Sequence, residues 1–84
     1  MTRYSLGLSM QGSAVYRIRV EGKLDPRHAG RLDDMNITAV ETADGRPESV
    51  LVGRLSDQAA LAGVLNTLYQ LGRPVLSVDC LEAE

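Results

Sequence analysis

Two arginines in the first strongly patterned segment of the chain are the side chains best placed to bind a ligand. Arg17 and Arg19 alternate with the apolar residues Tyr16, Ile18 and Val20. This period-two pattern predicts a strand with one apolar and one charged face. Both guanidinium groups then lie on the same face, where they could bind a carboxylate or phosphate through paired hydrogen bonds.

Cross-strand ion pairing is the alternative interpretation of Arg17 and Arg19. Acidic residues that could serve as partners are Glu21, Glu41 and Asp79. Each such pair would contribute a fraction of a kcal/mol, of the order expected for charged neighbours on a sheet. The two arginines are therefore candidates for a small-anion site or an interface, with structural pairing as the alternative.

A second, weaker group of polar residues is formed by Tyr16, His28 and Asn66. His28 is the only histidine, and as a general base it would need a carboxylate to orient it. Asp25 lies near it in sequence, but a lone surface histidine is the plainer interpretation. The sequence contains no complete catalytic constellation, and we expect no catalytic residues.

Metal and cofactor chemistry find little support in the residue types. The single cysteine, Cys80, excludes an intramolecular disulfide, and no Cys/His cluster offers a zinc site. The pair Asp33-Asp34 lacks further oxygen ligands at loop spacing, so a solvated turn is expected rather than a cation site. No glycine-rich run followed by lysine resembles a phosphate loop. We expect Cys80 to act as a small buried apolar residue, and we expect no metal or cofactor.

Length and charge narrow the class of protein. The chain has 84 residues, with nine basic and eleven acidic side chains and a net charge of −2. This predicts one small domain and argues against nucleic-acid binding, which favours a clustered basic surplus. No apolar run is long enough for a membrane span or for the core of a signal peptide. We therefore expect no membrane and a cytoplasmic location.

The elements that must position these residues follow one another in a simple order. Strands are predicted from residues 14–22, 35–42, 49–55 and 75–81. A short helix of at most two turns is predicted from residues 26–34, with Asp25 as its cap and Pro26 in its first turn. A longer helix begins after Ser56 or Asp57 and ends at Gly72 before Pro74. Its apolar stripe consists of Leu61, Val64, Leu65, Leu68 and Leu71.

The first thirteen residues are ambiguous. Tyr4, Leu6, Leu8 and Met10 alternate with small or polar residues, which is typical of a half-buried strand. Glycines and serines between them favour a loosely held tail instead. We expect residues 1–13 to be a flexible tail or an extra edge strand, and residues 14–84 to form a single α+β domain.

This order of elements predicts an α+β protein. A strand, a short helix, two strands, a long helix and a last strand give the βαββαβ order of a ferredoxin-like sandwich, whose four-stranded antiparallel sheet carries its helices on one face. In that arrangement Arg17 and Arg19 stand on the face without helices. Gly53, within a strand, indicates a bulge or a close approach of the backbone to a neighbour.

The chain resembles a group of small bacterial proteins of unassigned function. The similarity covers Tyr16 to Leu81 and is most specific in the segment Gly53-Arg54-Leu55-Ser56-Asp57-Gln58-Ala59-Ala60-Leu61. The chain departs from the group at Ala62, where histidine is frequent, and in the first crossover, where aromatic residues are frequent. The resemblance implies a compact cytoplasmic α+β module and no particular activity.

One good helix is too little cover for a four-stranded sheet. Val15, Val40 and one face of residues 50–52 cannot all point toward a single thin helical layer. We therefore expect a homodimer formed through the open face of the sheet, and a non-enzymatic module that binds a protein partner or small effector. The alternative is a cofactor-free small-molecule enzyme of the dimeric α+β barrel type, with Tyr16, His28 or Asn66 lining a cavity.

Overall fold

The fold is seen in a computed structural model that describes residues 12–83. In chain order the elements are strand β1 (Ala14–Glu21), 3-10 helix η1 (Pro26–Arg31), strands β2 (Asn36–Glu41) and β3 (Pro47–Leu55), helix α1 (Gln58–Gln70) and strand β4 (Val75–Ala83). The prediction for residues 1–13, a tail or an extra edge strand, lies outside the described residues for its first eleven positions.

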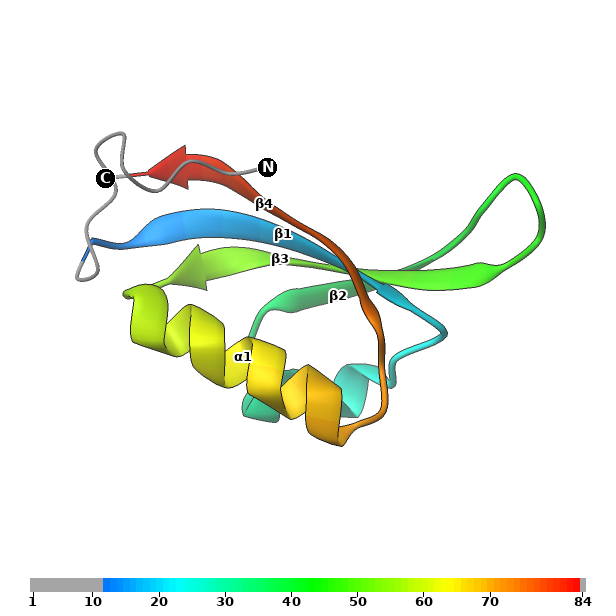
Figure 1. Ribbon diagram of the computed structural model, residues 1–84, viewed down its shortest axis with the longest axis horizontal. Coiled ribbons are helices and arrows are strands. Elements are labelled where there is room, and N and C mark those ends of the chain that lie inside the picture. The colour runs from blue at the N-terminus through cyan, green and yellow to red at the C-terminus, as the bar shows by residue number, and fades with distance from the viewer. Residues whose placement is uncertain (1–11, 84) are drawn as a thin grey trace.

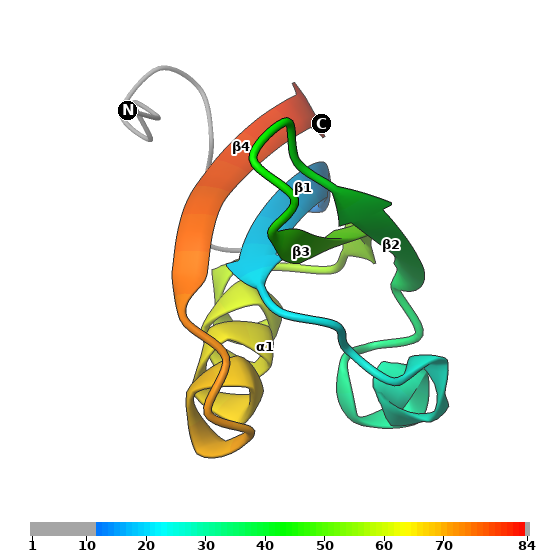
Figure 2. The ribbon, with the colours of Figure 1, turned by 90° about the vertical axis from the view of Figure 1, so that its right-hand side faces the viewer.

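The four strands form one antiparallel sheet in the order β2-β3-β1-β4. Helices α1 and η1 lie together on one side of it, and the other side carries neither (Figures 1 and 2). The predicted α+β class and four-stranded antiparallel sheet are therefore confirmed. The ferredoxin-like βαββαβ arrangement is not confirmed, because the first crossover carries η1 and the only α-helix in residues 12–83 is α1.

The hydrophobic core lies between the sheet and α1. Alternate residues of β1 are almost fully buried, from Ala14 through Tyr16 and Ile18 to Val20. They meet Leu51 and Leu55 of β3 and the stripe of α1, of which Leu61, Val64 and Leu68 are buried. The alternation of β1 and the helical spacing of α1 thus bury the faces that the sequence predicted.

Short polar contacts fix where the helices begin. The Asp57 carboxylate accepts a hydrogen bond from the Ala60 backbone N–H at 2.8 Å, and so caps α1. After α1, Gly72 adopts a φ of +72°, a conformation that side chains disfavour, and the chain turns into β4. Asp25 caps η1 in the same way, accepting from the Arg27 N–H at 2.9 Å.

Gly53 marks a close approach between β3 and the segment that enters β2. A Cβ atom at this position would lie 3.1 Å from Met35 Cγ and 3.3 Å from Met35 Cα. Since Met35 is itself almost fully buried, its side chain has little space into which it could move. The predicted close backbone approach at Gly53 is confirmed.

Within residues 12–83, no helix combines the length and apolarity needed to cross a membrane.

Candidate functional site

The side of the sheet opposite α1 and η1 is the surface on which the predicted arginines lie. We call it the open face. It carries three half-buried valines: Val50 and Val52 near the middle of β3, and Val15 near the beginning of β1. In register, Arg17 lies beside Val52 and Arg19 beside Val50. The open face therefore combines apolar and charged side chains.

Each arginine of the open face is paired with a carboxylate on a neighbouring strand. Arg17 contacts Asp79 of β4 at 3.3 Å, with both side chains nearly half exposed. Arg19 binds Glu48 of β3 through three hydrogen bonds of 3.1 to 3.2 Å. The Glu48 side chain is only 12% exposed. Cross-strand pairing, the alternative considered from sequence, is thus what the structure shows at both arginines, with Asp79 anticipated as a partner and Glu48 not.

A third ion pair of the same kind lies at the other end of the open face. Arg54 of β3 donates to Glu82 of β4 at 2.8 Å, across the intervening residue Val15. Exposed pairs of this sort contribute between zero and about 1 kcal/mol each. Their main effect is to pair three arginines with three carboxylates; Glu21, opposite Glu48 in the β1–β3 register, adds a fourth carboxylate to the open face.

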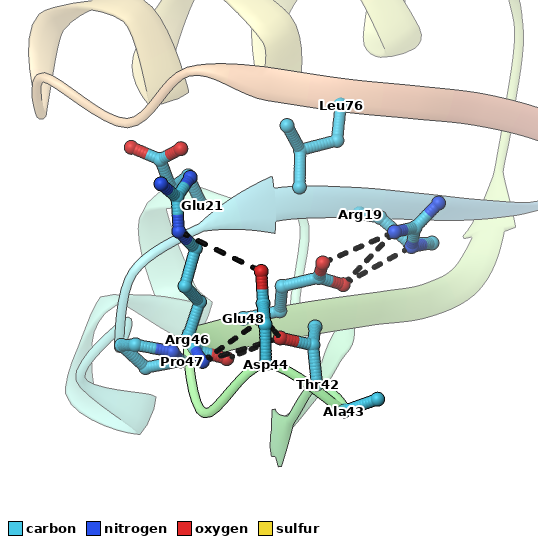
Figure 3. A pocket seen from close by; sticks show the side chains of 9 residues that line it. All are labelled: Arg19, Glu21, Thr42, Ala43, Asp44, Arg46, Pro47, Glu48 and Leu76. Carbon is cyan, nitrogen blue, oxygen red and sulfur yellow. Dashed lines mark hydrogen bonds and ion pairs between the residues drawn. The ribbon is translucent and has the colours of Figure 1, made fainter.

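The largest hollow described lies where the open face meets the β2–β3 hairpin, which extends past the end of the sheet (Figure 1). Its volume is about 620 Å³. Arg19 and Glu48 form its floor, the hairpin supplies Asp44 and Arg46, and Leu76 stands at its upper rim (Figure 3). It is an open basin lined by charged side chains and by the apolar residues Ala43, Pro47 and Leu76.

The hairpin that bounds this basin is held by its own turn residues. The Thr42 hydroxyl interacts with the Asp44 carboxylate, and the Thr42 backbone N–H donates to the Arg46 carbonyl at 3.0 Å. The Thr42 hydroxyl and the Arg46 backbone N–H hold the pKa of the Asp44 carboxyl below its usual range. Arg46 contacts Asp44 through Nε at 3.8 Å and is 73% exposed, so its guanidinium faces solvent.

The chemistry available in the basin is ion binding. Arg46 offers a guanidinium to an anion, and Glu21, which lies opposite Glu48 in the β1–β3 register, adds a third carboxylate to those of Asp44 and Glu48. Like charges directly opposite each other repel, and the bond from Arg19 to Glu48 offsets that repulsion. Anion binding at Arg17 and Arg19 remains a prediction, and a ligand there would compete with Asp79 and Glu48.

The weaker polar group predicted from sequence is spread over three parts of the molecule. Tyr16 is buried in the core, where the Gln58 side-chain amide donates to its hydroxyl at 2.6 Å. His28 is half-buried on η1, and Asn66 is exposed on α1. None of the three lines the hollows described here. Tyr16 belongs to the apolar alternation of β1, which is why it turns inward.

Residues 12–83 contain no cluster of three or more histidine, cysteine or acidic side chains arranged to hold a metal ion. Asp33 and Asp34 are exposed in the turn after η1, both with positive φ. Cys80 is half-buried and packs against the core from β4.

Two residues of this region, Glu48 and Arg46, were not predicted from the sequence. Glu48 follows Pro47 at the start of β3, and only the β1–β3 register brings it to Arg19. Arg46 belongs to the Asp44-Gly45 turn, and only the course of the hairpin brings it over the basin. The alternation of Glu48, Val50 and Val52 was the available signal for the first; the sequence offers none for the second.

Comparison with known proteins gives a family and no activity. No curated protein and no solved structure matches the chain. A family model described as a domain of unknown function, DUF8691, matches residues 15–79, from the second residue of β1 to the middle of β4. This range contains α1, η1, β2 and β3 entire and most of the open face. The chain therefore belongs to the DUF8691 family.

Proposed function

We propose that the protein is a non-enzymatic α+β interaction module that assembles as a homodimer through the open face of its sheet. The observation that carries the proposal is the strip of Val15, Val50 and Val52, which neither α1 nor η1 covers. An antiparallel sheet commonly has one solvated face, but such a face is usually polar. Packing a second sheet against the strip would remove these valines from water, at about 25 cal/mol per Å².

The charge pattern of the open face supports a second copy as the occupant. With Glu21 it carries three arginines and four carboxylates, a net charge of only −1, so the face as a whole attracts neither a strongly acidic nor a strongly basic partner. In a two-fold symmetric interface the same surface meets itself, and each contact occurs twice. A nearly neutral face on which both signs occur can meet a rotated copy with arginines opposite carboxylates.

The proposed place of assembly is the cytoplasm. The single Cys80 has no partner within the chain for a disulfide, which agrees with a reducing compartment.

The test is the mass of the protein in solution, measured by sedimentation equilibrium from about one to one hundred micromolar. The expected result is twice the 9.1 kDa chain mass. Val52→Lys places a charge in the middle of the strip. Because each copy would bring a lysine into the interface in place of a valine, at a cost of roughly 2 kcal/mol per copy, the dissociation constant should rise about a thousandfold.

Asn66→Lys is the matched control, since it adds the same charge on the exposed side of α1. This variant should remain dimeric, and both variants should keep the wild-type circular dichroism spectrum. A wild-type protein that is monomeric throughout the concentration range would refute the proposal. Equal dissociation of the two variants would also contradict it, because the interface would then not be the open face.

A further inference from the structure

The two edges of the sheet are protected unequally. The outer strand β4 pairs with β1 through two register shifts, one between Val15 and Tyr16 and the other between Arg19 and Val20. Such bulges are a common means of discouraging further strand pairing at an edge. The opposite outer strand, β2, pairs with β3 residue for residue without a shift. It contains no proline, glycine or lysine, and its one charged residue is Glu41 at its end, so Asn36–Val40 lack the usual protections.

The main-chain groups that β2 directs outward can be assigned from the hairpin. The Thr42 N–H donates to the Arg46 carbonyl, so this pair faces inward between the strands. Hydrogen-bonded and non-bonded pairs alternate along an antiparallel ladder. The next pair, Glu41 with Pro47, is accordingly non-bonded, and Pro47 has no N–H to give. By the same alternation Ile37 and Ala39 direct their N–H and C=O groups away from β3.

Ile37 and Ala39 also line a hollow of about 370 Å³. Their side chains share it with Leu24, Pro26 and the neighbouring residues of the β1–η1 loop. The hollow exists because η1 is a short 3-10 helix of six residues, so it covers less of the β2 side of the sheet than a full helix would. Outward main-chain groups and an apolar side-chain site therefore occur at the same two residues.

We propose that the β2 edge binds an extended peptide segment, which adds to the sheet as a fifth strand and places an aliphatic side chain in this hollow. Strand addition of this kind draws affinity from main-chain hydrogen bonds and specificity from pockets that take alternate side chains. A helix could fill the hollow but would leave the outward groups of Ile37 and Ala39 unpaired.

Lys23 predicts a second property of the peptide segment that binds at β2, namely its charge. It lines the hollow, is exposed and forms no ion pair within residues 12–83. The neighbouring Asp25 is already bound to Arg27 at 2.7 Å. The cation at the rim therefore favours a carboxylate on the segment, from an acidic side chain or a chain end, close to the aliphatic residue.

The test is selection from a phage-displayed library of random heptapeptides on the immobilised full-length protein. Enriched peptides should show the alternation of apolar and polar residues typical of a strand, with an aliphatic residue and an acidic residue close to it. Ala39→Pro removes one outward N–H while leaving every hydrogen bond to β3, a change that edge strands tolerate. It should weaken binding of the enriched peptides at least tenfold, as measured by fluorescence anisotropy with a fluorescein label.

Ala39→Ser is the matched control, because it keeps both the N–H and a small side chain, and it should bind within about twofold of wild type. Lys23→Glu should change the selected acidic residue to a basic one. Failure to enrich any sequence, or enriched peptides that bind Ala39→Pro as tightly as wild type, would overturn the proposal. So would self-association that Ala39→Pro abolishes, since β2 would then bind a second copy. Dimerisation through the open face uses different residues, and Val52→Lys tests it separately.

Discussion

Within residues 12–83, Ser49 is the fully buried polar residue among the apolar core residues, and its replacement gives the sharpest stability prediction. It is 0% exposed. Its hydroxyl accepts a hydrogen bond from the Leu24 N–H at 2.8 Å and donates one to the Gly22 carbonyl at 2.9 Å. Through these two bonds β3 holds the loop that connects β1 to η1.

Ser49→Ala removes both bonds and leaves the Leu24 N–H without its acceptor. An unsatisfied buried donor costs about 1–3 kcal/mol. The freed Gly22 carbonyl adds less, because carbonyl oxygens tolerate a missing partner better than N–H groups do. We expect the free energy of unfolding to fall by about 2 kcal/mol, and the melting temperature by roughly 8–16 °C for a domain of this size. Urea unfolding followed by circular dichroism measures the first quantity and calorimetry the second.

Ser77→Ala is the matched control. The Ser77 hydroxyl is buried on β4 and has no hydrogen-bond partner in the described part of the chain. Its removal should change the free energy of unfolding by less than about 0.5 kcal/mol, or raise it slightly. The reasoning fails if Ser49→Ala unfolds with the stability of wild type, or if the two variants lose the same amount.

Three further substitutions test the packing and the electrostatics. Gly53→Ala should lower the free energy of unfolding by about 1–3 kcal/mol, because its Cβ would press on the backbone of Met35. Gly63→Ala, within α1 and with open space around the added atom, should raise it by about 0.5–1 kcal/mol; the reverse order in urea unfolding would refute the packing argument. The hydrogen bond from the Arg27 side chain, with that from its backbone N–H, lowers the pKa of Asp25 from 3.8 to about 2. The stabilisation that follows is complete above about pH 4 and is lost as the pH falls through 2. Carboxyl carbon NMR of Arg27→Ala should show the Asp25 pKa moving upward, and an unchanged value would exclude the side-chain bond as its main cause.

The features that could be predicted from the sequence were those that depend on a few neighbouring residues. Asp57 and Gly72 bracket α1 because capping and chain reversal need only local geometry. The alternation of Tyr16, Ile18 and Val20 was sufficient to place Arg17 and Arg19 on the face without helices.

What the sequence could not supply depends on how distant segments meet. Glu48 is 29 positions from Arg19 in the sequence, and the pairing of β1 with β3 brings the two side chains together. A short helix was predicted over residues 26–34, whereas the structure has a 3-10 helix that ends at Arg31, followed by Leu32 and Met35 in the core. The sequence does not show how far each residue is buried. Tyr16, His28 and Asn66 were grouped without that information, and they lie in three different parts of the molecule.

The two unequal edges of the sheet also decide how far such molecules can grow. A sheet with two receptive edges can extend without limit, because each added strand exposes another, as happens in amyloid. Here β4 is interrupted by bulges and only β2 is regular. Edge-to-edge joining of whole molecules would therefore be limited to a pair that meets at β2, because the β4 edges of that pair are interrupted. One regular edge thus does not by itself let copies of this protein build an endless sheet.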